Sequence, residues 1–420
     1  MLRTTKLIGT ATLGLLLGVI ACHNDELFRP VTIQPVDPLF TRYVSMGNSI
    51  TAGFQSAGIN DSTQVQSYAN LLAGRMQTPF FQPLMNRPGC PPPYDNVYTQ
   101  HRVGGGTSTT CALRKPQPVP PPYINDVAVP GAEVMDGTSN LDTASNANTL
   151  TTFFLGGLTQ SQMMQRVNPT FITVWLGNND VLGAATSSTN AGDTTKVTDS
   201  THFANRYKAV LDSIDATPAS GHGVLIGVAN VTLIPYFSKG SKFWNVQART
   251  DSIAGSDSAG RHFPSNFLID PSCAPPHGDS VLVPFPAGAA RLAFARTNPG
   301  VTVGVICDDS VNVQPAELIK LQKAVTAYNA TIAAQASARG YAYVDPNALF
   351  ALLPPGAIPS FPNVISQTGH PVFVPSVTAT FGTFFSFDGV HPTGASHKLI
   401  ANALIAAINA KYGTSLVAIP

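Results

Sequence analysis

The chain has 420 residues, a formal net charge of +1 and only 11% charged residues. Its 24 basic residues nearly balance its 23 acidic ones and suggest no clustered basic face, so no nucleic-acid partner is expected. The length exceeds the ~100–150 residues of one ordinary domain, which leaves two domains or one domain with long insertions. Since no long linker divides the sequence, we interpret residues 40–420 as a single domain with insertions.

The N-terminal segment has the features of an export signal. Two basic residues precede an apolar run over residues 7–21, which is too short to span a bilayer as an ordinary helix. The run closes on Val19-Ile-Ala-Cys22, which resembles the lipobox of bacterial lipoproteins. The resemblance implies a cleaved signal peptide over residues 1–21, a membrane-anchoring lipid on Cys22 and a tether over residues 22–39. An ordinary signal peptide with a coincidental cysteine is the alternative.

The elements that follow alternate between strands and helices. Short apolar runs predict strands over residues 43–46, 126–129, 171–176, 224–228 and 342–344. Between or after them, a helical period predicts helices over residues 158–167, 203–214, 315–338 and 395–412. The last of these has Thr393 as its expected N-cap and Gly413 just past its end. Such alternation favours a parallel sheet with helices on both faces.

Four stretches interrupt this pattern, and we expect them to be long loop insertions. They lie near residues 78–123, 184–200, 236–310 and 354–383. The first and the last are punctuated by proline, which is incompatible with regular helix, and the second is rich in Thr and Ser.

Four cysteines remain after Cys22, and four cysteines allow three pairings. In an oxidising compartment we expect Cys90–Cys111 and Cys273–Cys307, because each pair brackets one insertion. Buried free thiols are the alternative. No metal site is expected, since the chain has neither a Cys-x-x-Cys nor a His-x-x-x-His spacing.

The candidate chemistry begins with Ser49, which follows the first predicted strand in Gly47-Asn-Ser-Ile. A neutral serine is a poor nucleophile and needs a base, a group that orients this base, and donors for the oxyanion. His391 is the candidate base, because Asp388 stands three residues before it. Gly131 and Asn179 follow the second and third predicted strands, so all these groups would meet at the carboxyl edge of one parallel sheet.

In chain order, these segments resemble blocks I, II, III and V of the SGNH (GDSL-type) esterase and lipase family. The resemblance spans residues 40–412 and implies a flavodoxin-like three-layer α/β/α sandwich. It also implies a triad of Ser49, Asp388 and His391, with an oxyanion hole formed by Ser49, Gly131 and Asn179. The tail Ile408-Asn-Ala-Lys-Tyr-Gly resembles the surface lipoprotein members, which implies attachment to the outer membrane, facing the cell surface.

Two details depart from a simple match. The family usually has Gly-Asp-Ser-Leu where this chain has Gly-Asn48-Ser-Ile, and asparagine can keep the same local hydrogen bonds. A second stretch, Gly278-Asp-Ser280-Val, is closer to Gly-Asp-Ser-Leu than the first. It lies after block III and lacks a preceding strand, so we interpret it as a turn. An α/β-hydrolase is disfavoured, because Thr51 stands where its Gly-x-Ser-x-Gly elbow needs glycine.

The sequence thus predicts a serine esterase or lipase that works through an acyl-enzyme on Ser49 and needs no cofactor. Its substrate would be a small-molecule, lipid or acylated-glycan ester, and we expect a monomer. Two alternatives stay open: an acyltransferase with the same triad, and an inactive surface lipoprotein that binds glycan or protein. Four phenylalanines before the histidine, at positions 381, 384, 385 and 387, are expected in the core rather than in a pocket.

Overall fold

The central sheet consists of parallel strands whose order matches a flavodoxin-like fold. Its four regular strands are β1 (Tyr43–Gly47), β4 (Phe171–Trp175), β5 (Gly223–Ile226) and β10 (Ala342–Val344), in the order β1-β4-β5-β10. Residues 125–129 run parallel to the free side of β1, so the five segments lie in the order 2-1-3-4-5. This is the flavodoxin-like doubly wound arrangement, with a switch point between the first and third segments.

The second predicted strand is the one that differs from expectation. Only Asp126 forms a ladder bridge with β1, although Val127 and Val129 also donate backbone hydrogen bonds to it. The Asn125 side chain donates to the carbonyl of Tyr43 at 2.8 Å and so takes the place of a backbone ladder bond. Residues 125–129 are therefore an extended edge segment rather than a regular strand.

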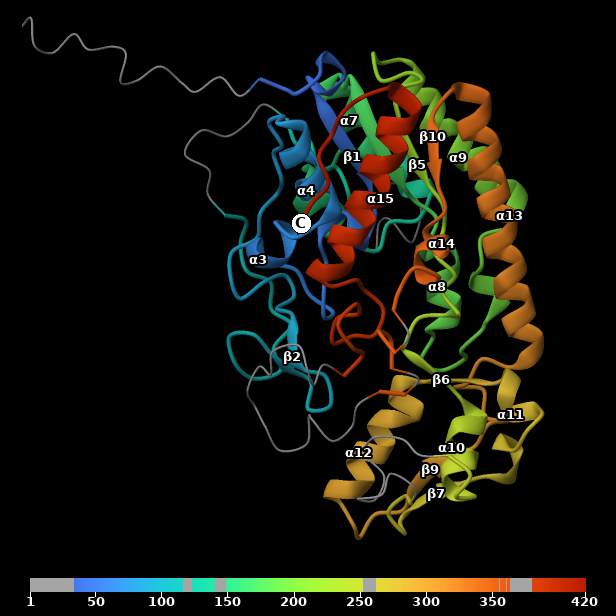
Figure 1. Ribbon diagram of the computed structural model, residues 1–420. Helices are drawn as coiled ribbons and strands as arrows, with labels where there is room; N and C mark the ends of the chain where they lie inside the picture. The colour runs from blue at the N-terminus through green and yellow to red at the C-terminus, as the bar shows by residue number, and fades with distance from the viewer. Residues whose placement is uncertain are drawn as a thin grey trace, which may run out of the picture. The chain divides into compact units, whose positions relative to one another are not determined.

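The strands contribute to two apolar cores, because successive side chains point to opposite faces of a sheet. In β1, Tyr43 belongs to one core, and Val44 and Met46 belong to the other. The first core is closed by α4 (Tyr68–Met76) and α15 (Gly394–Tyr412), which lie in front of the sheet in Figure 1. Three helices close the second core: α7 (Gln160–Val167), α9 (Ser200–Asp215) and α13 (Pro315–Arg339). The fold is thus the predicted three-layer sandwich.

The predicted ends of the last helix are found in the structure. The Thr393 hydroxyl accepts the N–H of Ser396 as an N-cap, and Gly413 adopts a left-handed conformation at the C-cap. Both signals act within one turn of the helix, which is why the sequence alone revealed them.

The segment 236–310 differs from the predicted loop, because its described residues form a lobe of short helices and strands (Figure 1), whose buried apolar side chains continue the second core. Its strands β6 (Phe237–Lys239) and β8 (Leu282–Pro284) pair antiparallel, and β7 (Phe267–Ile269) and β9 (Val303–Val305) pair parallel. Its helices are α10 (Gly240–Gln247), α11 (His277–Ser280) and α12 (Ala289–Thr297), with the 3-10 turns η5 (Pro271–Cys273) and η6 (Phe285–Ala287). The apolar side chains of Phe243, Leu292 and Phe267 are buried together, so this segment gains enough apolar burial to be ordered.

The first insertion is a hairpin region closed by the disulfide Cys90–Cys111, and the lobe contains the disulfide Cys273–Cys307. The hairpin consists of β2 (Tyr94–Asn96) and β3 (His101–Arg102). The remaining short elements are η2 (Pro38–Phe40), α2 (Ser49–Ala52), α3 (Asp61–Gln64), η3 (Met135–Gly137), α6 (Thr149–Leu155), α8 (Asn179–Ala185), η4 (Thr194–Lys196) and α14 (Pro346–Phe350).

The computed structural model describes residues 34–115, 123–139, 149–251, 262–354, 356–359, 361–362 and 380–420. The described residues from Pro35 to Pro420 belong to one compact unit. The predicted signal peptide, Cys22 and most of the tether lie outside the described residues. Across the described ranges, every helix is too short or too polar to cross a bilayer.

Candidate active site

Ser49 is held by a sharp connection between β1 and α2. The strand ends at Gly47, and the Asn48 side chain caps the new helix by accepting the N–H of Ile50 at 3.0 Å. A Cβ on Gly47 would lie 2.1 Å from the hydroxyl of Thr51, so only glycine allows the chain to turn so tightly here. Ser49 is the first helical residue, and its N–H has no partner inside the helix. This amide is therefore available to an oxyanion.

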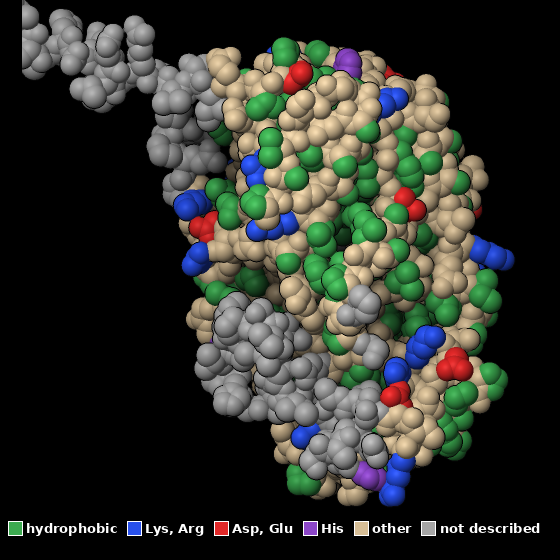
Figure 2. Space-filling view, in the orientation of Figure 1, with side chains coloured by type: hydrophobic (Ala, Val, Ile, Leu, Met, Phe, Trp, Pro, Cys, Tyr) green, Lys and Arg blue, Asp and Glu red, His purple; other side chains and the backbone are tan. Residues whose placement is uncertain are grey.

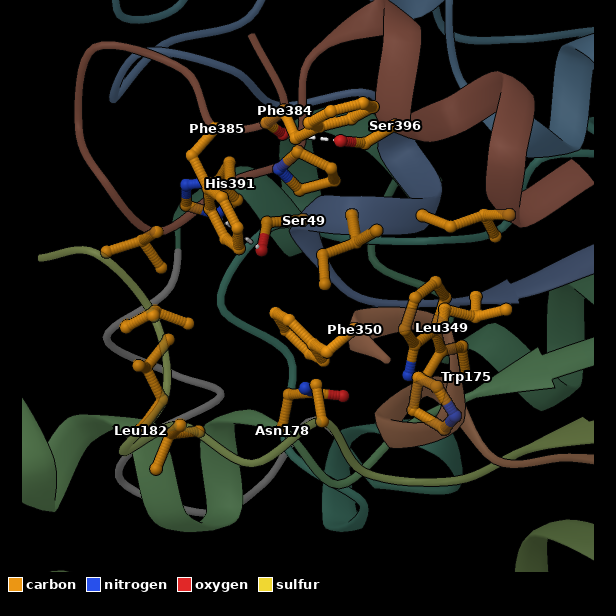
Figure 3. A pocket seen from close by; sticks show the side chains of 18 of the residues that line it. Ser49, Trp175, Asn178, Leu182, Leu349, Phe350, Phe384, Phe385, His391 and Ser396 are labelled. Atoms are coloured by element: carbon orange, nitrogen blue, oxygen red, sulfur yellow. Dashed lines mark hydrogen bonds between the residues drawn. The ribbon is translucent and has the colours of Figure 1, made fainter. Parts of the chain in front are cut away.

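Three side chains from two distant parts of the chain form a hydrogen-bonded relay at the start of α2. The Nε2 of His391 lies 2.9 Å from the Oγ of Ser49 (Figure 3), and its Nδ1 lies 2.8 Å from Oδ2 of Asp388. The Phe54 ring packs against the imidazole, with 4.9 Å between the ring centres. The side chains of His391 and Asp388 are 13% and 10% exposed, so the relay is largely shielded from water. The structure thus brings together the three residues predicted as a triad.

Asp388 is held in its ionised form by its neighbours. Burial alone raises the pKa of Asp388, but the charge and hydrogen bonds of His391 and the backbone N–H of Val390 more than offset this and lower it to about 2. The hydroxyl of Ser386 and the N–H groups of Val390 and His391 all donate to Oδ1. A carboxylate so fixed can hold the imidazole with Nδ1 protonated and Nε2 free to accept a proton.

A turn that sequence reasoning missed supports Asp388 from the other side. The N–H of Ala57 donates to Oδ2 of Asp388 at 2.6 Å, and the N–H of Ser56 donates to Ser386 at 2.8 Å. Both turn residues have positive φ, 55° at Ser56 and 52° at Ala57, in a two-residue turn between Gln55 and Gly58. Such turns usually contain Asn or Gly, and Ser-Ala provides no sequence signal for one.

Arg102 fixes this turn through the first insertion. Its Nη1 donates to the carbonyls of Ala57 and Pro92, at 3.0 and 2.5 Å. The guanidinium lies over the Tyr94 ring at 3.9 Å from the ring centre, and the residue is only 6% exposed. The disulfide-closed insertion is therefore connected to the triad acid through two hydrogen bonds in series.

The predicted oxyanion donors lie at the ends of neighbouring segments of the sheet. Val129 donates to the carbonyl of Gly47, and the Asn179 amide nitrogen donates one hydrogen to the carbonyl of Ala132 at 2.8 Å. These bonds hold Gly131, whose φ is 84°, between the end of β1 and the start of α8. Asn179 lines the same cavity as Ser49, and its amide nitrogen keeps a second hydrogen that can point into it.

Two other segments resemble parts of the predicted triad in sequence but differ from it in geometry. Ser280 is exposed and ends the short helix α11, rather than following a strand as a nucleophile would. Asp199 stands three residues before His202, as Asp388 does before His391, but its carboxylate accepts backbone N–H groups of Thr201 and His202 as the N-cap of α9. The spacing alone therefore does not make a triad.

An apolar cavity opens beside the Ser49 hydroxyl (Figure 3). Its volume is about 110 Å³. Phe384 lines it, contrary to expectation, and Phe385 lines it while also belonging to the buried core, where Phe381 is fully buried as expected. The other side chains that line it come from the end of β4, from the loop after β5 and from α2, α8, α14 and α15, and include Ile50, Trp175, Leu182, Ile234, Leu349, Phe350 and Ile400.

The profile of the GDSL-like lipase and acylhydrolase family matches residues 43–404, which is most of the chain. The chain belongs to this family. The match includes Ser49, Asp388 and His391, and it agrees with the resemblance seen in the sequence. As a member, the protein is a hydrolase of carboxylic esters.

Several solved structures are similar to this chain at low sequence identity. An acetylxylan esterase, Axe2, from Geobacillus stearothermophilus is 12% identical, with a TM-score of 0.35, over 89% of this chain and 95% of that one. An extracellular lipase from Streptomyces rimosus is 14% identical, with a TM-score of 0.36, over 87% and 99%. A putative GDSL-like lipase from Parabacteroides merdae is 11% identical, with a TM-score of 0.34, over 90% and 99%. Among curated protein sequences, none matches this chain.

Proposed function

We propose that the protein is a serine esterase that hydrolyses carboxylic esters through an acyl-enzyme on Ser49. The observation that carries the proposal is the continuous hydrogen-bonded series from Ser49 Oγ through His391 to Asp388, with distances of 2.9 and 2.8 Å. These are the distances at which a histidine can take a proton from a serine hydroxyl.

In the first half of the reaction, Ser49 Oγ attacks the ester carbonyl carbon while its proton moves to Nε2 of His391. The amides of Ser49 and Gly131 and the side chain of Asn179 stabilise the negative charge on the carbonyl oxygen. The proton on Nε2 then passes to the alkoxy oxygen as the C–O bond breaks. The alcohol leaves, and the acyl group stays on Ser49.

In the second half, His391 takes a proton from a water molecule whose oxygen attacks the acyl carbon. The bond to Ser49 Oγ breaks, the proton returns to Oγ, and the carboxylic acid is released. Asp388 stays ionised throughout and stabilises the imidazolium that forms in each half.

The test uses the mature chain with a fluorophosphonate probe and a p-nitrophenyl ester. We expect the probe to label Ser49, and Ser49→Ala to abolish both labelling and hydrolysis, while Ser280→Ala keeps both. Labelling of Ser280, or hydrolysis that survives in Ser49→Ala, would refute the proposal. Addition of an acceptor alcohol separates hydrolysis from acyl transfer, since a transferase would form a new ester in preference to the free acid.

We further propose that Cys22 carries a lipid that anchors the protein to the bacterial outer membrane. The support is the Val-Ile-Ala-Cys22 sequence at the end of a short apolar run. We expect Cys22→Ser to release the protein from the membrane fraction or leave it unprocessed. Unchanged fractionation together with an unchanged mass would show that this proposal is wrong.

A further inference from the structure

The cavity beside Ser49 has a reactive end and an apolar end. Ser49 and His391 lie at one side of it, and Figure 3 shows Phe350 across the open space from the Ser49 hydroxyl. Its other walls include Trp175 and Leu349, which belong to or pack against the apolar core under α4 and α15. An ester bound at Ser49 can therefore extend one of its two halves toward that core.

The half of the ester in this cavity has to be apolar. Among the described residues, the deeper walls present carbon atoms from aliphatic and aromatic side chains such as Ile50, Leu349 and Ile400. A sugar hydroxyl placed against them would lose its hydrogen bonds to water, at a cost of roughly 1–3 kcal/mol for each unpaired group. A methylene in the same place contributes a favourable ~0.8 kcal/mol. The cavity thus selects hydrocarbon over glycan.

The reaction order favours the acyl half as the occupant. The acyl group stays bonded to Ser49 while the alcohol leaves and water arrives, whereas the alcohol departs after the first half of the reaction. An enclosed site next to Ser49 therefore stabilises the acyl half in both steps, and an alcohol held there would obstruct the exchange of alcohol for water.

The volume sets the size of the chain that fits inside. An apolar cavity of about 150 Å³ holds benzene, which has six carbons, so a cavity of 110 Å³ takes about four. The carbonyl carbon lies at Ser49 and the next carbon at the cavity entrance, so four further carbons inside the cavity give an acyl chain of about six carbons. An acetyl group, which has one carbon beyond the carbonyl, would leave most of the cavity empty.

The surroundings of the cavity can accommodate a longer chain. Leu399 lines it and is 42% exposed, so apolar surface continues outside the cavity. Figure 2 shows hydrophobic side chains gathered on this face, near α14 and the start of α15. Carbons beyond the sixth can lie against Leu399.

We infer that the substrates are esters of fatty acids of about six or more carbons, with the acyl chain in the cavity walled by Leu349, Phe350 and Ile400. This inference rests on the proposed acyl-enzyme at Ser49 and adds the substrate class. It excludes acetylated glycans as the preferred substrates.

The test compares two ester series on the mature wild-type chain, with all esters below their critical micelle concentrations. In the first, p-nitrophenyl esters run from acetate through butanoate and hexanoate to dodecanoate. We expect kcat/KM to rise about fourfold per methylene, or about 200-fold over the four methylenes from acetate to hexanoate, and then to level off. In the second, acetate esters of increasingly long alcohols should show no such rise. A maximum at acetate, or a rise with alcohol length instead, would overturn the inference.

A variant that fills the cavity tests whether the acyl chain binds there. We expect Leu349→Trp to lower the ratio of kcat/KM for hexanoate to that for acetate at least tenfold. The control Leu268→Trp changes an exposed leucine on β7 in the lobe and should leave this ratio unchanged. If Leu349→Trp fails to fold, Leu349→Ala serves instead, and its optimum should move to longer chains. An unchanged chain-length profile in the folded variant would contradict the inference.

Different results would overturn the proposed esterase function and the proposed acyl-chain specificity. Hydrolysis that depends on Ser49 but peaks at acetate would leave the proposed function intact and overturn the substrate class. Hydrolysis that persists in Ser49→Ala would overturn the proposed function and, with it, the acyl site.

Discussion

The backbone N–H of Ala57 donates a 2.6 Å hydrogen bond to the carboxylate of Asp388, 331 residues further along the chain. Ala57 holds this position with a φ of 52°, which an alanine adopts only at a cost of about 1–2 kcal/mol. The strain persists because Arg102 binds the Ala57 carbonyl and Ser386 binds the preceding N–H. The orientation of Asp388 thus depends on a turn that its own segment does not contain.

This dependence predicts that Arg102→Met lowers activity from outside the triad. The change keeps a long apolar side chain but leaves the carbonyls of Ala57 and Pro92 without their donor. We expect steady-state kinetics to show a fall in kcat of about tenfold, since the carboxylate of Asp388 then orients the imidazole less firmly.

The control for this prediction is Arg87→Met. Arg87 lies in the same insertion but is exposed and pairs with Asp61 rather than with the turn. It should leave kcat as in the wild type. Equal effects of the two variants would mean that Arg102 acts only on general stability.

The triad and the oxyanion donors should give graded losses. Ser49→Ala and His391→Ala each break the same step, so the double variant should be hardly worse than either single one, at about 10⁴-fold or more below the wild type. Asp388→Ala should lose less, because the imidazole can still act as a base part of the time. Asn179→Ala should lower kcat by about 10²–10³-fold through loss of one oxyanion donor. Steady-state kinetics on the folded variants decide this, and strictly additive losses for Ser49 and His391 would contradict it.

Asn48→Asp should keep activity within about tenfold of the wild type, a difference of ~1.4 kcal/mol in the barrier. The aspartate can still accept the N–H of Ile50, and a carboxylate at a helix start is favoured by the helix dipole. We would measure kcat and KM together with the thermal midpoint. A loss of several orders of magnitude in a folded variant would show that the Asn48 amide takes part in the reaction.

The buried carboxyl of Asp126 should make the protein less stable as the pH rises. Burial raises the pKa of Asp126 to about 7, although hydrogen bonds from Gln82, Ser45 and Ala128 act in the opposite direction. A pKa that is higher in the folded state than in the unfolded chain stabilises the protein below the unfolded value, near 3.8, and this contribution is lost as the pH rises through 7. Asp126 alone should therefore lower the unfolding free energy by up to ~4 kcal/mol between pH 4 and pH 8, whereas His397, whose pKa burial lowers to about 3, acts in the opposite direction.

Urea unfolding at pH 5 and pH 8 checks this prediction. Asp126→Asn should lose less stability than the wild type over this interval, since its amide does not ionise, while the opposing contributions of Asp180 and His397, whose pKa values burial shifts to about 6 and about 3, are the same in both proteins. The control Asp193→Asn changes an exposed carboxyl whose pKa is lowered by hydrogen bonds to Thr195, so it should leave the difference between the two pH values unchanged. An equal pH dependence of stability in the wild type and Asp126→Asn would contradict the prediction.

The features that the sequence by itself determined are those encoded within a few residues. Strand β10 and the caps of α15 at Thr393 and Gly413 were predictable, because side-chain alternation and helix capping are local interactions. Ser49, Gly131 and Asn179 were predictable as a set, because parallel strands bring the residues that follow them to one edge of the sheet. His391 instead lies in the connection just before α15 and follows none of the sheet strands described. The spacing of Asp388 and His391 acquired meaning only from that set, since Asp199 and His202 have the same spacing and form a helix cap.

The tertiary structure alone decided the features that depend on contacts between distant residues. The turn at Ser56 and Ala57 has no sequence signal, because its positive φ angles are held by Arg102 and Ser386 rather than by glycine or asparagine. The segment 236–310 was predicted as a loop, because its helices and strands are short and are stabilised by apolar contacts with one another and with the second core. The size of the cavity beside Ser49 depends on side chains from β4, the loop after β5, α2, α8, α14 and α15, and neither periodicity nor spacing records how closely such separate elements pack.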